Sequence, residues 1–232
     1  MIIHVEMHDR ADHAREVAGY YRLRKTVFHD RLGWDVEVQG NEERDCLDDM
    51  PCTYALSVDE NGQVNAGIRL IPTTQTTLLD LAFDGLVPED FDFHSPTIWE
   101  LSRFCVDSAA AAERLPVGLG MATLELSLAN LDYALRNGIT HYIIVTERRM
   151  YELTRVFSLG FELLGSRTID GCDVVCGLIS IDERARAASE RLRGVMQAQR
   201  TSCTDATSRV RAPEASRSDP ETLAAKTRSP QA

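Results

Sequence analysis

The sequence predicts an α/β fold, a three-layer sandwich with helices on both sides of one mixed sheet. Two adjoining strand candidates, Thr53–Val58 and Val64–Ile71, are separated by a turn whose Asn61-Gly62 pair favours a β-hairpin. Further along the chain, strand and helix patterns alternate, as they do in α/β proteins. A hairpin followed by alternating elements within one core indicates a sheet that contains both strand directions.

The first half of the chain provides a strand, a helix and a third strand for the hairpin group. Ile2–Val5 has the apolar character of a short strand, and Ala11–Phe28 shows helical spacing. The residues on the apolar side of that helix are Val17, Tyr20, Tyr21, Leu23, Val27 and Phe28. Residues 33–50 are acidic and rich in turn formers, and Thr97–Val106 is the third strand candidate.

The second half supplies the alternating elements. Leu119–Arg136 is strongly periodic and predicts a helix, and His141–Val145 is short and apolar, which is typical of a buried strand. Arg148–Leu159 is a second helix candidate, and Cys172–Ile181 is the closing strand. With the strand at Thr97–Val106, the order is strand–helix–strand–helix–strand.

The 232 residues divide into a folded domain and a polar C-terminal segment. We place the catalytic domain at residues 1–182, a helical extension at 183–200 and a disordered tail at 201–232. The extension is dominated by Arg and Ala, which suit a helix. The tail is rich in Ser, Thr, Ala and Pro, so it cannot bury enough apolar surface to offset its ordering entropy.

Charge and composition narrow the class of partner. Residues 1–182 hold 30 acidic and 15 basic residues, which argues against nucleic acid, because phosphate neutralisation needs a basic face. No stretch approaches the roughly 18 apolar residues of a membrane helix, and no signal peptide is visible. We therefore expect a cytoplasmic protein without membrane insertion. Scattered cysteines and the His4/His8 pair predict no metal site.

Eight polar or aromatic residues stand where a plain fold does not need them. In chain order they are Arg24, Phe28, Trp34, Asp45, Asp48, Arg69, Glu100 and Arg103. Arg69 interrupts the apolar segment AGIRLI, so its guanidinium is expected to be buried or in a cleft and to need a carboxylate partner. Asp45 and Asp48 supply matching negative charge.

Glu100 and Arg103 pose the same problem on another strand. Positions three apart on a strand face opposite sides unless a bulge intervenes. On these features alone, a buried ion-pair network with no catalytic role is an open alternative to an active site.

The eight residues resemble, in type, order and approximate spacing, the signature of acyl-homoserine-lactone synthases. The skeleton RxxxF…W…DxxD…R…ExxR covers roughly residues 1–180. The resemblance implies a fold related to N-acetyltransferases, with a V-shaped opening between two central strands for the acyl-pantetheine arm. It also implies synthesis of an N-acyl-L-homoserine lactone for quorum sensing from S-adenosylmethionine and an acyl thioester, with release of 5′-methylthioadenosine. S-adenosylmethionine is then a substrate, and no cofactor is expected.

Glu100 and Arg103 are the candidate catalytic residues within that chemistry. The α-amine of S-adenosylmethionine, with a pKa of about 7.7–8.0, must lose a proton, and Glu100 is the candidate base, directly or through water. Ring closure by the methionyl carboxylate needs positioning more than acid or base, because the sulfonium is a good leaving group. The candidate residues for binding S-adenosylmethionine are Arg24, Phe28, Trp34, Asp45, Asp48 and Arg69.

Several of these roles have structural alternatives. Arg24 and Arg103 suit the substrate carboxylate or the acidic residues that shape the pocket, and the two aspartates suit orientation of the arginines. Phe28 and Trp34 suit the adenine or the sulfonium, and simple packing in the core is the alternative. Glu100 is alternatively an ion-pair partner of a neighbouring arginine.

Arg148, Arg149 and Arg155 surround the start of a predicted helix and are candidates for docking the donor carrier. Acyl carrier protein is strongly acidic, so a basic patch would steer it, and the same arginines suit the phosphates of an acyl-coenzyme A. The alternative is a solvated helix face with Glu147 and Glu152 as local partners.

The segment LPVGLGMATLEL resembles the phosphate-binding loop of acetyltransferases, in which glycine amides at a helix N-terminus hold pyrophosphate. Gly118 and Gly120 are present, but Leu115 stands where those enzymes place Arg or Gln, and Arg114 is one step out of register. This departure argues against a generic acetyl-coenzyme A enzyme without excluding a coenzyme A donor.

Two other functions stay open at this stage. One is an N-acyltransferase of the acetyltransferase superfamily that acts on another amine and releases no methylthioadenosine. The other is a binding domain with a structural ion-pair network.

Overall fold

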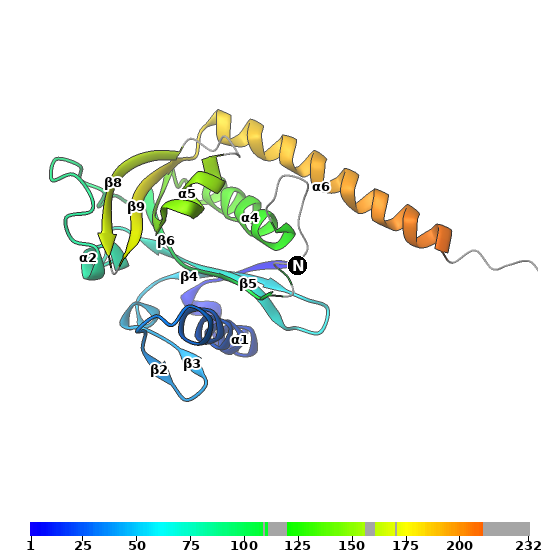
Figure 1. Cartoon of the computed structure of the whole chain (residues 1–232), viewed down its shortest axis with the longest axis horizontal. Coiled ribbons are helices and arrows are strands. Elements are labelled where there is room, and N and C mark those ends of the chain that lie inside the picture. The colour runs from blue at the N-terminus through cyan, green and yellow to red at the C-terminus, as the bar shows by residue number, and fades with distance from the viewer. Residues whose placement is uncertain (109, 111–119, 156–160, 170, 211–232) are drawn as a thin grey trace, which may run out of the picture. The chain divides into compact units, whose positions relative to one another are not determined.

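A seven-stranded mixed sheet forms the centre of the fold (Figure 1). The computed structural model describes residues 1–108, 110, 120–155, 161–169 and 171–210. Across the sheet the strands are β1 (Ile2–Val5), β4 (Thr53–Val58), β5 (Val64–Pro72), β6 (Ile98–Val106), β7 (His141–Glu147), β9 (Cys172–Ser180) and β8 (Phe161–Ile169). β6 and β7 are parallel, and the other neighbours pair antiparallel.

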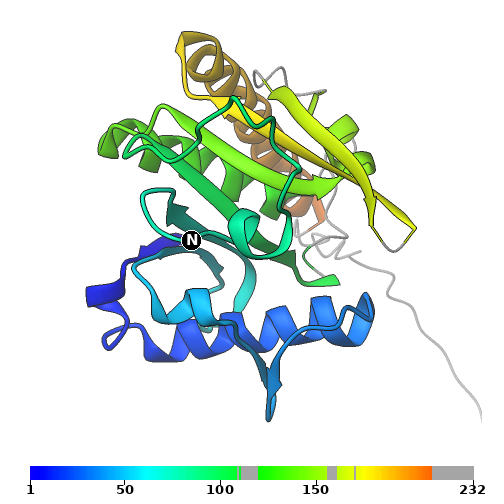
Figure 2. The same ribbon diagram turned by 90° about the vertical axis from the view of Figure 1, so that its left-hand side faces the viewer.

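Helices cover both faces of this sheet, as Figures 1 and 2 show. α1 (Ala14–Arg24) packs on β4 and β5 from one side, and α4 (Met121–Asn137) packs on the same strands from the other, beside α5 (Arg148–Arg155). The predicted three-layer α/β sandwich is thereby confirmed. The smaller elements are η1 (Met7–Asp9), the π-helical η2 (Lys25–Arg31), β2 (Val38–Gln39), β3 (Glu42–Glu43), η3 (Cys46–Asp49) and α2 (Leu78–Ala82).

Two elements differ from the sequence expectation. The first helix begins at Ala14. At Lys25 it passes into the π-helical η2, whose backbone hydrogen bonds join residues five apart instead of four apart. β8 was not predicted, because its residues do not alternate regularly between buried and exposed positions. β8 is an edge strand of the sheet and pairs with a neighbouring strand on one side only, so a weak alternation of buried and exposed residues is tolerated there.

The chain divides into a compact unit of Met1–Arg193 and a second unit of Gly194–Ala232. α6 (Glu183–Val210) extends beyond the predicted end of the helical extension at residue 200. Adding a residue to an existing helix costs much less free energy than nucleating a new one, so polar residues can continue α6. Residues 211–232 of the predicted tail lie outside the described residues. In the described part of the chain, no helix combines the length and apolar content of a membrane span.

β6 and β7 are hydrogen-bonded to each other over a short stretch and then separate. Their ladder extends from Ile98, opposite His141, to Leu101, opposite Ile144. β6 nevertheless continues to Val106 and β7 to Glu147. This is the point in the sheet at which the V-shaped opening between central strands is expected.

α1 contacts the sheet closely at Gly67 on β5. A Cβ atom at this position would lie 2.5 Å from the ring of Tyr20 and 3.0 Å from a methyl group of Leu56. The Tyr20 side chain is fully buried, and its hydroxyl donates a hydrogen bond to the carbonyl oxygen of Arg103 at 2.7 Å. The missing side chain at Gly67 therefore allows Tyr20 to reach β6.

We expect Gly67→Ala to destabilise the protein by about 1–3 kcal/mol, because the added methyl group must displace the buried Tyr20 ring. Urea unfolding followed by circular dichroism measures the change. An unfolding free energy within about 0.5 kcal/mol of the wild-type value would show that the helix shifts without loss.

Candidate active site

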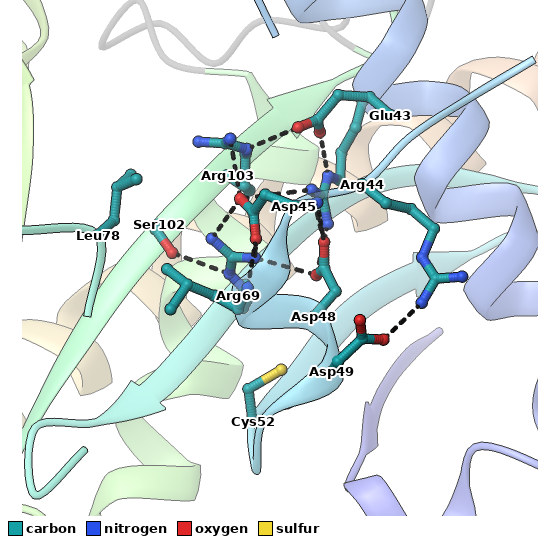
Figure 3. Close-up of polar contacts among 12 residues, drawn as sticks. Glu43, Arg44, Asp45, Asp48, Asp49, Cys52, Arg69, Leu78, Ser102 and Arg103 are labelled. Carbon is teal, nitrogen blue, oxygen red and sulfur yellow. Dashed lines mark hydrogen bonds and ion pairs between the residues drawn. The ribbon is translucent and has the colours of Figure 1, made fainter. Parts of the chain in front are cut away.

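Three arginines and three carboxylates meet in one cluster on the α1 side of the sheet (Figure 3). The arginines are Arg24, Arg69 and Arg103, and the carboxylates are Glu43, Asp45 and Asp48. They come from α1, β5, β6, β3 and the start of η3. We call this group the charge cluster. Its opposite charges are equal in number, so each is compensated inside the protein.

Arg24 joins the end of α1 to η3. Its Nη1 and Nη2 atoms donate to the two carboxylate oxygens of Asp48 at 2.8 and 2.9 Å, and its Nε donates to Glu43 at 2.5 Å. Asp48 also accepts from the Tyr54 hydroxyl at 2.8 Å and from the backbone N–H of Asp45 at 2.9 Å, within the capping box that begins η3. Arg24 and Asp48 are both shielded completely from solvent.

Arg69 lies at the middle of β5, and its side chain is fully buried. Its Nη1 and Nη2 atoms donate to the two oxygens of Asp45 at 2.5 and 3.0 Å, and Nη1 also donates to Asp48 at 3.0 Å. The Nε atom donates to the Ser102 hydroxyl at 3.2 Å. The prediction that this strand arginine requires a carboxylate partner is confirmed, and the structure supplies two.

A bulge in β6 aims Arg103 at the charge cluster. Gly67 pairs with Cys105 and Arg69 pairs with Ser102, so two residues of β6 oppose one residue of β5. Arg103 is one of these two and has a φ of +54°, in the left-handed region that a side chain with a Cβ rarely adopts. Its side chain therefore lies on the same face as Ser102 and Glu100, which resolves the three-residue spacing.

Arg103 is the arginine of the cluster that reaches solvent. Its Nε donates to Glu43 at 3.1 Å and its Nη2 lies 2.8 Å from Asp45. The Arg103 side chain is 12% exposed and that of Asp45 is 17% exposed, whereas the other charged side chains of the cluster are fully buried. The cluster thus opens to the outside at the Arg103–Asp45 edge.

Glu43 was missed by the sequence reasoning. It is fully buried and bridges Arg24 and Arg103. A signal was present, because Glu43 precedes Asp45 by two residues and alternate residues of an extended chain face the same side. The acidic character of the whole segment concealed it.

Phe28 and Trp34 form a stacked pair beside the open edge of the cluster. Their ring centroids are 5.1 Å apart at an interplanar angle of 16°, and the Arg103 guanidinium lies 5.8 Å from the Phe28 centroid. Gly33, with a φ of +67°, turns the chain back so that the Trp34 N–H donates to the Phe28 carbonyl oxygen at 2.9 Å. Phe28 is buried, but Trp34 is 44% exposed and offers a free indole surface.

Glu100 lies outside the charge cluster, although it shares its face of the sheet. Its two carboxylate oxygens accept from the backbone N–H groups of Leu78 and Leu79, at 3.2 and 2.8 Å. The residue is only 2% exposed. Among the residues that the structure describes, no ion pair joins Glu100 to an arginine. Ser102 lies two residues along β6, or about 7 Å by strand geometry.

The pKa values of the cluster aspartates and of Glu100 are shifted in opposite directions. Burial alone would raise the pKa of Asp48, but the Arg24 and Arg69 guanidinium groups outweigh it and hold that pKa well below the usual range. The pKa of Asp45 is lowered in the same way, by Arg69 and Arg103 against the effect of burial. The pKa of Glu100 is instead raised, because burial outweighs its hydrogen bonds. Guanidinium groups thus favour the ionised form of the two aspartates, whereas burial favours the protonated form of Glu100.

The predicted donor-docking residues are described in part. Arg148 donates from Nε to a carboxylate oxygen of Asp173 on β9, and Arg149 is exposed. The side chain of Arg155 lies outside the described residues, as do Gly118, Leu115 and Arg114 of the glycine segment. Gly120 directly precedes α4 as its N-cap.

A mixed sheet that separates between β6 and β7, with the charge cluster and the Glu100 carboxylate on one face, fits the N-acetyltransferase type of fold found in acyltransferases. Comparisons with known proteins give the family. The model of the autoinducer synthase family matches residues 8–186, and the chain belongs to that family.

Individual relatives agree with this assignment. An acyl-homoserine-lactone synthase of Agrobacterium fabrum (strain C58 / ATCC 33970) is 32% identical over 174 residues, covering 74% of this chain and 81% of the relative. The crystal structure of the AHL synthase LasI superposes with a TM-score of 0.69 at 28% identity, over 81% of this chain and 93% of LasI. TofI, crystallised in a ternary complex with an inhibitor and MTA, gives a TM-score of 0.67 at 28% identity, over 82% and 96%.

We expect Asp48→Asn to lower the free energy of unfolding by about 3–5 kcal/mol, because it leaves two buried guanidinium groups short of negative charge. Denaturant unfolding at pH 7 measures the loss. Asp49→Asn is the matched control, since the Asp49 side chain is 78% exposed and pairs with Arg44 on the surface. It should change stability by less than about 1 kcal/mol. Equal effects of the two variants would contradict the importance of the buried pair.

The effect of Asp48 should also depend on pH. Its pKa in the folded protein is depressed, so its contribution is fully present above the unfolded value of about 3.9 and is lost as the pH falls towards the folded value. The gap in stability between wild type and Asp48→Asn should therefore narrow below about pH 4. A gap that stays constant from pH 7 to pH 3 would contradict the depressed pKa.

Proposed function

We propose that this autoinducer synthase joins an acyl thioester to S-adenosylmethionine and releases an N-acyl-L-homoserine lactone and 5′-methylthioadenosine. The amine nitrogen attacks the thioester carbonyl, the C–N bond forms and the thiol leaves. The methionyl carboxylate then attacks the γ-carbon, the C–S bond of the sulfonium breaks and the lactone ring closes. The observation that carries this proposal is the charge cluster, which opens at one arginine beside a stacked aromatic pair.

The open edge of the cluster suits the methionine-derived half of the substrate. Among the described residues, Arg103 engages Nε with Glu43 and Nη2 with Asp45, so Nη1 is the nitrogen that we assign to the substrate carboxylate. The exposed indole of Trp34 suits the adenine or the sulfonium, which a ring face attracts. TofI was crystallised with MTA, which is consistent with a methylthioadenosine product. Both substrates arise inside the cell, so we place the reaction in the cytoplasm.

The remaining residues of the cluster act as a scaffold in this proposal. Arg24 and Arg69 are fully buried and saturated by carboxylates, so they position Asp45 and Asp48 rather than contact substrate. Through Asp45 they set the orientation of Arg103. Their contribution to S-adenosylmethionine binding is therefore indirect.

Glu100 is the proposed base for the amine. It lies on the same face of β6 as Arg103, and burial raises its pKa towards that of the α-amine, which improves a proton acceptor. Its limited exposure favours proton transfer at short range or through one water molecule.

Incubation of the full chain with S-adenosylmethionine and a panel of acyl thioesters tests the reaction itself. Lactone and methylthioadenosine should appear together in equal amounts. The competing function, N-acylation of another amine, would give neither. Failure of every donor to yield both products would refute the proposal.

We expect Glu100→Gln to reduce the rate of lactone formation by about 10²- to 10⁴-fold, because the amide cannot accept the amine proton. Calorimetric titration should show S-adenosylmethionine binding within a few-fold of wild type. Glu162→Gln on the exposed face of β8 is the matched control and should retain full activity. A near-full rate for Glu100→Gln would remove Glu100 from the role of base.

The acyl donor is proposed to dock at the start of α5. Arg149 is exposed there, whereas Arg148 is engaged with Asp173 and contributes less free charge. An exposed arginine on an otherwise acidic protein suits an anionic carrier, either acyl carrier protein or coenzyme A.

We expect Arg149→Glu to raise the KM for the carrier-bound donor by about 3- to 10-fold at low salt and to leave kcat unchanged, because a surface charge acts on encounter. Arg22→Glu makes the same change of charge on α1, on the other side of the sheet, and should leave KM unchanged. Measuring both donor types identifies the carrier. An unchanged KM with both donors would exclude docking at this position.

A further inference from the structure

A short helix from another part of the chain holds the carboxylate of Glu100. The first two N–H groups of α2, at Leu78 and Leu79, donate to Oε1 and Oε2 at 3.2 and 2.8 Å. Each carboxylate oxygen therefore receives one backbone hydrogen bond. The Thr77 hydroxyl, next to these amides in the chain, is a further hydrogen-bonding group that lowers the pKa of Glu100.

α2 is in turn fixed by a capping box. The Thr77 side chain accepts from the Asp80 N–H, and the Asp80 carboxylate accepts from the Thr77 N–H at 2.8 Å and from its hydroxyl at 2.9 Å. A helix as short as Leu78–Ala82 does not persist without such support. The buried Leu79 side chain adds a packing contact. The two amides thus have a defined direction before any substrate binds.

We propose that α2 is a positioning element for the reaction, whose Leu78 and Leu79 amides orient Glu100 and keep it ionised for deprotonation of the substrate amine. This inference rests on the proposed function, in which Glu100 is the base. The amine proton passes to the carboxylate as the C–N bond forms, and the departing thiolate then takes it up. The amides donate hydrogen bonds throughout and exchange no proton.

Among the groups that lower the pKa of Glu100, the two α2 amides have the largest effect. Burial raises the pKa of Glu100, and the Leu79 and Leu78 amides, the Arg69 charge and the Thr77 hydroxyl lower it, in that order of effect. From β9, the Cys176 thiol has a pKa raised to about 12 by burial and by the Glu100 charge, so it is neutral near pH 7.

The ionisable groups at the capping box itself are Asp80 and His94. The His94 Nε2 lies 3.5 Å from an Asp80 carboxylate oxygen, and its Nδ1 lies 2.7 Å from the Thr73 carbonyl oxygen. Both groups act on α2 and not directly on the Glu100 carboxylate.

Leu78→Pro removes one amide with little other change. Leu78 is the first residue of α2, a position where proline is tolerated, and Thr77 has the extended backbone that a following proline requires, with φ −116° and ψ 173°. Leu78→Ala is the matched control, because both variants lose the leucine side chain and only proline lacks the N–H group. Differences between the two variants therefore report the hydrogen bond.

The first measurement is the pKa of Glu100 itself, from ¹³C NMR titration of its carboxyl carbon in the full chain. The pKa should be about one unit higher in Leu78→Pro than in Leu78→Ala, because a hydrogen bond to the charged form is lost. Equal pKa values in the two variants would overturn the positioning role of α2, whether or not Glu100 is the base.

The second measurement is the pH dependence of kcat for lactone formation. The acid limb should move to higher pH by the same amount, so that Leu78→Pro is about 10-fold slower than Leu78→Ala below the limb and recovers at high pH. A changed Glu100 pKa with an unchanged acid limb would overturn the catalytic use of α2, and with it the assignment of Glu100 as base. Absence of lactone from the wild-type protein would refute the proposed function alone, and the NMR titration would still decide the contact.

Thr77→Ala and Thr77→Ser provide an independent pair if the proline variant does not fold. Thr77→Ala removes the hydroxyl that caps α2 and that also lowers the pKa of Glu100 directly, and Thr77→Ser retains both effects, so this pair tests the whole Thr77–α2 support of Glu100. We expect the alanine variant to raise the pKa of Glu100 and the serine variant to match wild type. Equal behaviour of the two variants would overturn the proposal.

Discussion

The burial of two guanidinium groups, those of Arg24 and Arg69, is the constraint on which the rest of the N-terminal half depends. An unpaired charge in the interior destabilises a protein by several kcal/mol, so Arg24 and Arg69 require carboxylates that arrive with the right geometry. Those carboxylates come from β3 and η3, which are only two and four residues long. The ion pairs, together with the buried Leu47 side chain, hold this short segment against α1 and the sheet, and the same segment places Asp45 at the exposed edge of the cluster.

Two kinds of carboxylate result from this arrangement. Asp45 and Asp48 in the charge cluster are surrounded by guanidinium groups, which lower their pKa values against the effect of burial. Glu100, a short distance along the same face, is satisfied by neutral amides and keeps a raised pKa. The bulge at Arg103 makes the two environments neighbours, because it turns an arginine of the same strand towards the cluster. A regular β6 would have placed that arginine on the α4 side.

The sequence predicted two kinds of feature. One kind is set by the periodicity of apolar residues, and the other by the cost of burying a single charged side chain without a partner. The hairpin, the mixed sheet and the need of Arg69 for an acid all follow from local rules and are present in the structure. Partners chosen by tertiary geometry did not follow. The amides of Leu78 and Leu79 carry no side-chain signal, and the edge strand β8 has no clear alternation. The bulge was recognised as a condition for Glu100 and Arg103 to share a face, but its position in β6 came only from the strand register.

The equal numbers of positive and negative groups also determine the electrostatic potential that the charge cluster produces at a distance. Because Arg24, Arg69 and Arg103 are matched one for one by Glu43, Asp45 and Asp48, the field of the cluster decays within a few ångströms as that of a multipole. An approaching sulfonium ion is therefore drawn mainly by the acidic surface that makes up the chain's net charge of −11. Long-range attraction and local recognition are thereby separated, and surface charge can change without altering the selectivity of the site.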